Sequence, residues 1–327
     1  MKKLFCILLC LCTLTACGGS RTASGDTDKP KIVVTIFPLY DWTRQILGRQ
    51  AANVDLTLLL RNGTDMHSYQ PTVDDMILIS DADLFIYVGG ESDAWVQDAL
   101  KGASGRALNL MDALGGAVRV EEALPGMEPE PDDGTTYDEH IWLSLKNAFT
   151  CCHAIADTLD GMDIISSADA SAEGYASPFF VFSHHADEYT VKMMELDARY
   201  RDTVQAAPLK SILFADRFPF RYLAADYGLD VYAAFQGCSA ETEASFETIA
   251  FLSGKLDELS LPAVLTTESA DGRLAETIIR TSNRPETEIL SMNSMQSVTE
   301  AEIASGTNYL SVMEANLEVL SRALGVA

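Results

Sequence analysis

The chain has 327 residues, of which 47% are apolar and 22% are charged, and these proportions are typical of a folded globular protein. They exclude a disordered or collagen-like chain. The 48 acidic and 23 basic residues give a formal net charge of −25, which would repel nucleic-acid phosphates and anionic lipid head groups. Composition therefore favours a cation as partner and predicts no binding to nucleic acid.

The amino-terminal segment has the pattern of a signal peptide. Lys2 and Lys3 precede an apolar run at 4–16, whose 13 residues fall short of the about 20 that a bilayer span needs. The run ends in Leu14-Thr15-Ala16-Cys17, which resembles the lipobox of bacterial lipoproteins. We predict that residues 1–16 are removed and that Cys17 is lipidated, which anchors the chain on the extracytoplasmic face of the membrane. A plain secretory signal cleaved near Ala16 is the alternative.

Residues 17–30 carry Gly, Ser, Thr and charge without periodicity and are predicted to be a flexible tether. After them, short apolar runs alternate with amphipathic segments of helical length. Predicted strands lie at 32–37, 54–60, 84–88, 212–214, 231–235, 263–266 and 288–291; predicted helices lie at 40–47, 73–79, 94–100, 246–259 and 274–281. Such strands, separated by helices, predict parallel sheets covered on both faces and therefore an α/β fold.

The segment 172–206 has only a helical signal, with Tyr189, Met193, Leu196 and Tyr200 at spacings of four, three and four. We therefore predict two lobes, 31–171 and 207–327. Each would be a parallel sheet flanked by helices, and one long helix within 172–206 would connect them. The ligand site is expected in the cleft between the lobes. The acidic segment 121–139 is expected to be an exposed loop.

Two of the five histidines stand in positions that suggest a ligand role, and His67 stands where α/β folds place ligands. His67 follows the predicted strand at 54–60, and His140 leaves the acidic segment before a helix that starts near Lys146. Side chains at the carboxyl ends of parallel strands face the ligand. A satisfied structural role is the alternative for each imidazole.

Two carboxylates occupy equivalent positions in the second lobe. Asp216 follows the run at 211–214, and Glu268 follows 264–267. Two imidazoles and two carboxylates form a mixed nitrogen and oxygen donor set, which suits Zn²⁺ or Mn²⁺. The alternatives are a salt bridge from Asp216 to Arg217 or Arg221, and a helix cap by Glu268 before Gly272.

The other reactive side chains are predicted to be structural. Cys151, Cys152 and Cys238 are only three thiols outside the leader and form no disulfide framework. The adjacent Cys151 and Cys152 are expected to be small buried hydrophobes. His184 and His185 are expected to face solvent, and His153 to be structural. The chain has no His-Glu-x-x-His motif, phosphate loop or nucleophile elbow, which weighs against an enzyme.

Several motifs in combination resemble one known family. They lie at 33–40, 63–71, 81–88, 138–147, 222–229 and 241–245. The chain resembles the metal-binding lipoproteins of bacterial zinc and manganese ABC importers, solute-binding proteins of cluster A-I type. The resemblance implies two α/β lobes and one rigid helix, capture of Zn²⁺ or Mn²⁺ as the transported ligand, and delivery to an ABC permease. We expect a monomer and not an enzyme.

The family's ligands carry over unevenly. His67 and His140 match directly. The family's third ligand corresponds to a position within 216–222. The spacing to Tyr222 is one residue longer here than in the family, and Asp216 is the expected substitute for that ligand. The fourth ligand corresponds to Asn293, whose neutral amide is a weaker donor than a carboxylate. Glu268 is therefore expected to take that position, with Asn293 as a supporting group or weak ligand.

Three other functions remain open from the sequence. A metal-dependent hydrolase would show turnover rather than stoichiometric binding. A surface adhesin with a structural metal would keep its partner after loss of the His67 side chain. A binder of organic solutes would need an aromatic-lined cleft, and the chain has only three Trp. Zn²⁺ and Mn²⁺ are not separated by residue types alone.

Overall fold

The structure is a computed structural model that describes residues 29–126, 136–237 and 243–326. The predicted signal peptide, Cys17, most of the predicted tether and Cys238 lie outside these ranges. Within the described ranges, no helix has both the length and the apolar character that crossing a membrane requires.

The first lobe is built on a parallel sheet in the order β2-β1-β3-β4. Its strands are β1 (Lys31–Val34), β2 (Asp55–Leu58), β3 (Leu84–Tyr87) and β4 (Arg106–Asn109). Its helices are α1 (Phe37–Leu47), α2 (Val73–Ser80), α3 (Val96–Ala99), α4 (Leu110–Leu114) and α5 (Leu145–Asp160). Short 3₁₀ turns are η1 (Gly48–Asn53), η2 (Met66–Ser68), η3 (Leu100–Gly102), η4 (Gly115–Ala117) and η5 (Ile141–Leu143).

Two local differences from the sequence prediction have simple causes. The first strand ends at Val34 instead of residue 37, because Pro38 stands in the first turn of α1, where a proline favours a helix start. Strand β4 was missed because Arg106 and Ala107 are exposed, so the short edge strand lacks a continuous apolar run.

The second lobe repeats the arrangement with a parallel sheet in the order β6-β5-β7-β8. Its strands are β5 (Ser211–Phe218), β6 (Asp230–Gln236), β7 (Ala263–Thr267) and β8 (Glu288–Met292). Its helices are α8 (Arg221–Tyr227), α9 (Phe246–Glu258), α10 (Arg273–Thr281), α11 (Glu300–Ala304) and α12 (Tyr309–Ala323). The predicted α/β class and the two-lobe architecture are confirmed.

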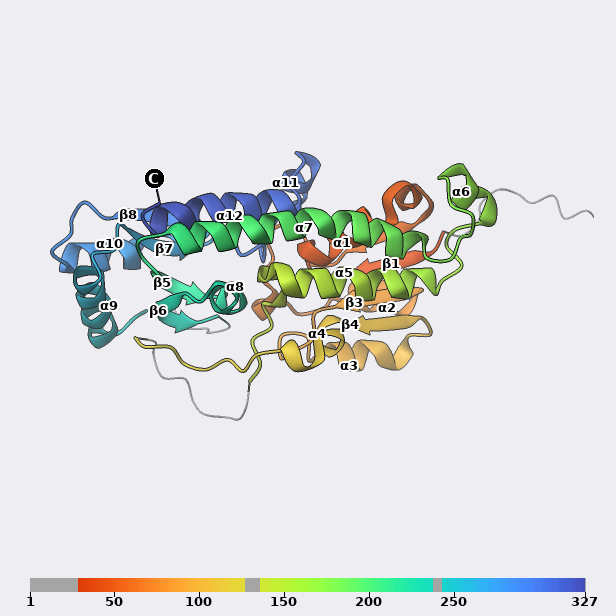
Figure 1. Cartoon of the computed structure of the whole chain (residues 1–327). Helices are drawn as coiled ribbons and strands as arrows, with labels where there is room; N and C mark the ends of the chain where they lie inside the picture. The colour runs from red at the N-terminus through yellow and green to blue at the C-terminus, as the bar shows by residue number, and fades with distance from the viewer. Residues whose placement is uncertain (1–28, 127–135, 238–242, 327) are drawn as a thin grey trace, which may run out of the picture.

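The long connecting helix is α7 (Val181–Ala206), preceded by the short α6 (Ser167–Ala172). Figure 1 shows α7 running along both lobes, with α12 packed beside it. The helix begins nine residues later than residue 172, after a loop that contains Gly174 and Pro178. The larger hydrophobic cluster contains buried residues of both lobes, among them Trp42 and Phe214, so the two lobes share one core.

A buried carboxylate ties α1 to the end of the chain. Asp41 on α1 accepts a hydrogen bond from the backbone N–H of Tyr309 (2.9 Å), the first residue of α12. The Tyr189 hydroxyl of α7 donates to the same oxygen (3.4 Å). The carboxylate therefore stands at a helix amino terminus, where its charge is favourable. Tyr309 also packs edge-on against Trp42, with ring centroids 5.1 Å apart.

Replacing Asp41 with alanine should destabilise the fold by about 1–3 kcal/mol, because the buried N–H of Tyr309 loses its acceptor. Urea unfolding of wild type and Asp41→Ala measures this difference. Asp98→Ala is the matched control, since Asp98 pairs only with Lys101 on the exposed surface. An equally small effect for both variants would contradict the proposed role of Asp41.

Candidate metal centre

His67 is oriented by the carboxylate two residues before it. Asp65 opens the turn η2, and its Oδ1 accepts hydrogen bonds from the His67 backbone N–H (3.0 Å) and from His67 Nδ1 (2.8 Å). A carboxylate only accepts, so the proton of the neutral imidazole is on Nδ1, which leaves the lone pair of Nε2 for a ligand.

His140 repeats the same local geometry. Asp138 Oδ1 accepts from the His140 backbone N–H (2.9 Å) and from His140 Nδ1 (3.0 Å). The side chains of Asp138 and His140 are both fully buried. The sequence thus contains the motif Asp-x-His twice, and each copy forms what we call an Asp–His pair: Asp65–His67 and Asp138–His140.

Each Asp–His pair is held by an arginine from the second lobe. Arg217 on β5 contacts Asp65 Oδ2 (3.2 Å), and Arg221 on α8 contacts Asp138 Oδ2 (3.2 Å). Burial opposes ionisation of Asp65, but His67 and the Arg217 guanidinium outweigh it and hold the pKa of that carboxyl well below its usual range. Asp65 is therefore ionised at neutral pH and remains an acceptor for His67.

The two imidazoles lie together. Their ring centroids are 5.2 Å apart, and the rings are tilted by 42°. Both Nε2 atoms are buried, and neither has a hydrogen-bond partner among the described residues. A buried nitrogen lone pair without a partner is costly, and a metal ion would satisfy both at once. The predicted pairing of His67 with His140 thus has a geometric basis.

Asp216 is turned toward its neighbouring strand. One of its oxygens, Oδ2, accepts hydrogen bonds from the backbone N–H (3.0 Å) and the hydroxyl of Thr267 on β7. The register of β5 against β6 shifts between Phe214 and Arg217, which is a β-bulge. A bulge adds one residue and re-aims the side chains after it, so Arg217 reaches Asp65. The alternative of a salt bridge from Asp216 to Arg217 or Arg221 is wrong, because both arginines pair elsewhere.

Glu268 lies on the wall of a small cavity between the lobes. The cavity has a volume of about 70 Å³ and is lined by Gly63, Asp65, Arg217, Pro219, Gly237, Thr267, Glu268, Ser269, Ser294, Gln296 and Ser297. Glu268 accepts from the Ser294 backbone N–H (2.8 Å) and hydroxyl (2.8 Å). The alternative of a helix cap is wrong, since Gly272 itself holds the capping position of α10.

Asn293 supports the loop after β8. Its side-chain oxygen accepts from the Met295 backbone N–H (2.7 Å), and its own backbone N–H donates to Asn316 (2.8 Å). Within residues 29–126, 136–237 and 243–326, no three His, Cys, Asp or Glu side chains are grouped closely enough to hold a metal ion. The structure therefore brings His67 and His140 together and does not gather Asp216 or Glu268 around them.

The prediction that 121–139 is an exposed loop is wrong at its carboxyl end, because Asp138 and Glu139, directly before His140, are buried. Glu139, which sequence reasoning missed, accepts a hydrogen bond from the Ser92 backbone N–H (3.2 Å), and burial raises its pKa to about 7. Its side chain lies so close to Gly90 that an added Cβ there would stand 2.8 Å from Oε2. Gly90, at φ +88°, therefore makes room for this carboxyl. The only sequence signal was its place inside the second Asp-x-His motif.

Among the remaining predictions for histidine and cysteine, some are confirmed and one is wrong. Cys151 and Cys152 are free and buried, as predicted. His184 is half exposed, whereas His185 is mostly buried and its Nδ1 contacts the Ile46 carbonyl oxygen at 2.8 Å. Exposure of His185 was thus predicted wrongly, because successive residues of a helix point about 100° apart and only one of the two can face water.

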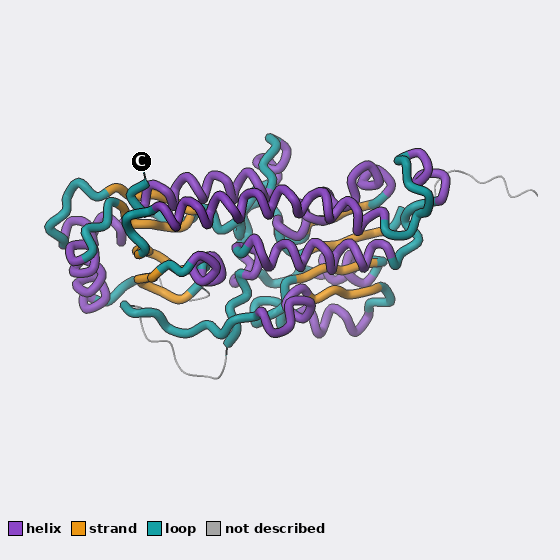
Figure 2. The backbone as a smooth tube through the Cα atoms, in the orientation of Figure 1, coloured by secondary structure: helices purple, strands orange, loops and turns teal. Residues whose placement is uncertain are grey.

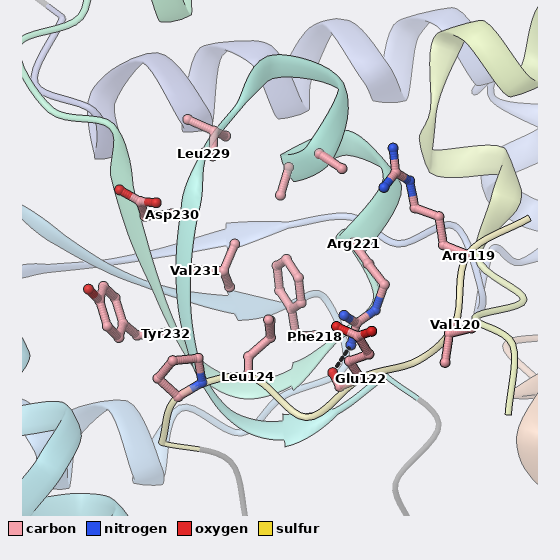
Figure 3. A pocket seen from close by; sticks show the side chains of 13 residues that line it. Arg119, Val120, Glu122, Leu124, Phe218, Arg221, Leu229, Asp230, Val231 and Tyr232 are labelled. Atoms are coloured by element: carbon pink, nitrogen blue, oxygen red, sulfur yellow. Dashed lines mark hydrogen bonds between the residues drawn. The ribbon is translucent and has the colours of Figure 1, made fainter. Parts of the chain in front are cut away.

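A wider cavity of about 620 Å³ lies on the other side of Arg221 (Figure 3). Figure 3 shows the segment at 119–125 facing β6, with Arg221 directed at Glu122, whose carbonyl oxygen accepts from Nη2 at 2.6 Å. No histidine lines this cavity. None of the predicted ligands lines it.

Comparison with known proteins assigns the chain to a family. Residues 32–323 match the family described as "Zinc-uptake complex component A periplasmic". The chain belongs to this family. It is a family of metal-binding transport components and not of enzymes.

Individual relatives agree with this membership in the zinc-uptake family. The chain is 32% identical to the zinc-binding lipoprotein AdcA of Streptococcus pneumoniae strain R6, over 98% of this chain and 61% of AdcA, so it spans about three fifths of that relative. It is 28% identical to the high-affinity zinc uptake system protein ZnuA of Bacillus subtilis, over 98% and 97% of the two chains. The Zn(II)-bound ZnuA-like domain of AdcA superposes with a TM-score of 0.67 at 28% identity, covering 90% and 99%.

The two arginine contacts should differ in strength. Arg221→Gln should cost about 3 kcal/mol, because it leaves the buried Asp138 without its cation, whereas Arg217→Gln should cost about 1 kcal/mol or less at a half-exposed pair. Chemical denaturation measures both. Arg199→Gln, which breaks an exposed pair with Glu314, is the control. Equal losses for all three variants would show that burial does not set the strength of these contacts.

Asp93 should make stability depend on pH. Burial raises the pKa of Asp93 to about 6, although the hydrogen bond that it accepts from the Gly89 backbone N–H acts to lower this pKa. The unfolded state loses this proton first, so stability should fall by up to about 3 kcal/mol as pH rises from about 4 through 6. Asp93→Asn removes this dependence. The measurement is the difference in unfolding free energy between wild type and Asp93→Asn across that range; a constant difference would refute the assignment.

Proposed function

We propose that the chain captures Zn²⁺ outside the cytoplasm and delivers it to an ABC permease. The observation that carries the proposal is the pair of buried, unpartnered Nε2 atoms of His67 and His140. Neutral imidazole is a favourable ligand for Zn²⁺, and each ring is oriented by a carboxylate on its other nitrogen, as in many zinc sites. The names of AdcA, a zinc-binding lipoprotein, and of ZnuA, a zinc uptake system protein, support this choice of metal.

We propose Glu268 as the donor from the second lobe. It lines the interlobe cavity together with Asp65, and three serine contacts leave part of its acceptor capacity, since a carboxylate offers about four lone-pair sites. Asp216 was the other predicted donor. Its contacts with Thr267 favour a role in holding β5 against β7, and the contacts of Asn293 favour a structural role.

We propose the same location as the sequence predicts, with lipidated Cys17 holding a monomer on the extracytoplasmic face of the membrane. The lipoprotein name of AdcA and the periplasmic family description support this placement. Mn²⁺ remains the second candidate ion, because geometry and availability decide between the two metals more than intrinsic affinity.

Zinc titration of the chelator-treated, purified protein tests the proposal. Wild type should bind one Zn²⁺, and His67→Ala or His140→Ala should lower affinity by more than about 100-fold, since even loss of a supporting group costs 10–100-fold. Glu268→Gln should weaken binding more than Asp216→Asn or Asn293→Ala. Affinity should also fall at low pH, because a protonated imidazole cannot bind a metal.

His153→Ala is the control for the titration, because His153 lies on α5 away from the Asp–His pairs. Wild-type affinity in both His67→Ala and His140→Ala would reject the site. A parallel titration with Mn²⁺ decides between the metals, and tighter binding of Mn²⁺ would reject zinc as the cargo.

A further inference from the structure

Two adjacent phenylalanines stand in solvent at one end of the first lobe. Phe179 is 68% exposed and Phe180 is 74% exposed. They lie in the loop between α6 and α7, directly before the first residue of α7 (Figure 1). Single exposed apolar residues are ordinary, but two neighbouring aromatic rings in water leave a large apolar area without cover.

The backbone at this turn has an unusual conformation. Phe180 has φ 67° and ψ 16°, a left-handed conformation that a bulky side chain rarely adopts. The turn is fixed from the other side by Asp160, whose carboxylate accepts from the backbone N–H groups of Phe182 (3.0 Å) and Ser183 (2.9 Å). Strain of this kind persists only where the surrounding structure imposes it, and it is common at functional positions.

The loop between α6 and α7 lies at the same end of the first lobe as the start of the described chain (Figure 2). Lys29, where the described structure begins, donates to the Ala52 carbonyl oxygen (2.9 Å). Gln50, two residues before Ala52, donates to Glu173, which also contacts His185 in the second turn of α7 (3.5 Å). These contacts link the start of the described chain to the loop that carries the two rings.

The distance from the predicted lipid anchor is short. Twelve residue steps separate Cys17 from Lys29, and a chain of that length reaches at most about 40 Å and on average about 20 Å. An anchored chain therefore keeps this end of the lobe close to the bilayer at a high effective concentration. The opposite end of the molecule has no such restraint.

We propose that Phe179 and Phe180 insert into the interfacial region of the bilayer and hold this end of the first lobe against the membrane. The proposal rests on the proposed anchor at Cys17. Aromatic and other apolar side chains at the head-group level are a common mode of interfacial attachment.

The negative charge around the two rings indicates that the membrane contact is apolar and not electrostatic. Residues 157–180 hold five carboxylates and no lysine or arginine: Asp157, Asp160, Asp163, Asp169 and Glu173. Lys29 and Arg106 stand at the same end and only partly offset these five carboxylates, so anionic head groups would on balance be repelled. Zwitterionic vesicles should therefore support the contact at least as well as anionic ones, and added salt should not release it.

A tryptophan in place of Phe180 reports the contact. The lipidated full chain with Phe180→Trp is reconstituted on phosphatidylcholine vesicles with and without brominated acyl chains. We expect a blue-shifted emission and a loss of intensity on brominated lipid, after subtraction of the unsubstituted protein. Phe246→Trp is the matched control, because Phe246 is 93% exposed at the start of α9 in the other lobe, and its emission should not change.

The outcomes separate this contact from the anchor and from metal binding. Protein that floats with the vesicles but shows no quenching at position 180 overturns the membrane contact and leaves the anchor intact. Protein that does not float overturns both, while zinc titration is unaffected. A concentration-dependent blue shift without vesicles would identify a second copy of the chain as the occupant and would also overturn the proposal.

Discussion

The candidate metal centre depends on two carboxylates that each bind an imidazole and an arginine at once. Asp65 and Asp138 fix the rings of His67 and His140 through one oxygen, and the other oxygen of each accepts from Arg217 or Arg221 of the opposite lobe. The same contacts therefore set the orientation of the two imidazoles and join the two lobes at this point. Each of these two carboxylates is paired with a guanidinium. The negative charge of both carboxylates is therefore balanced locally, although the chain as a whole is strongly acidic.

The two lobes behave as one packed body around that centre. A single hydrophobic cluster contains residues of both, and Tyr309 joins them through Asp41, Trp42 and the Trp142 carbonyl oxygen (2.7 Å). Trp142 in turn donates from its indole nitrogen to the Ser294 carbonyl oxygen (2.8 Å), beside the serine contacts of Glu268. Movement of Glu268 toward the imidazoles would thus be a local change in the loops after β7 and β8, since hinge opening would break this core.

The β-bulge in β5 shows how a single residue can redirect a site. Side chains alternate along a strand, so one extra residue reverses which of them face a given direction. Asp216 consequently contacts Thr267, and its neighbour Arg217 reaches Asp65. The longer spacing to Tyr222 was visible in the sequence, but its consequence was not, because pairing with β6 decides where the extra residue is absorbed.

Residue patterns alone predicted the α/β class, the two sheets and the long helix, because hydrophobic periodicity is a local property of the chain. His67 and His140 were singled out by their places in the sequence and by the family resemblance, and the structure puts their rings side by side. Only the tertiary structure decided which groups meet. Arg217 and Asp65 lie 152 positions apart, and the buried carboxyl of Glu139 acquires its high pKa from packing that no neighbouring residue encodes. The direction in which a side chain points and its exposure to solvent depend on contacts between distant segments. Those contacts form only when the chain folds.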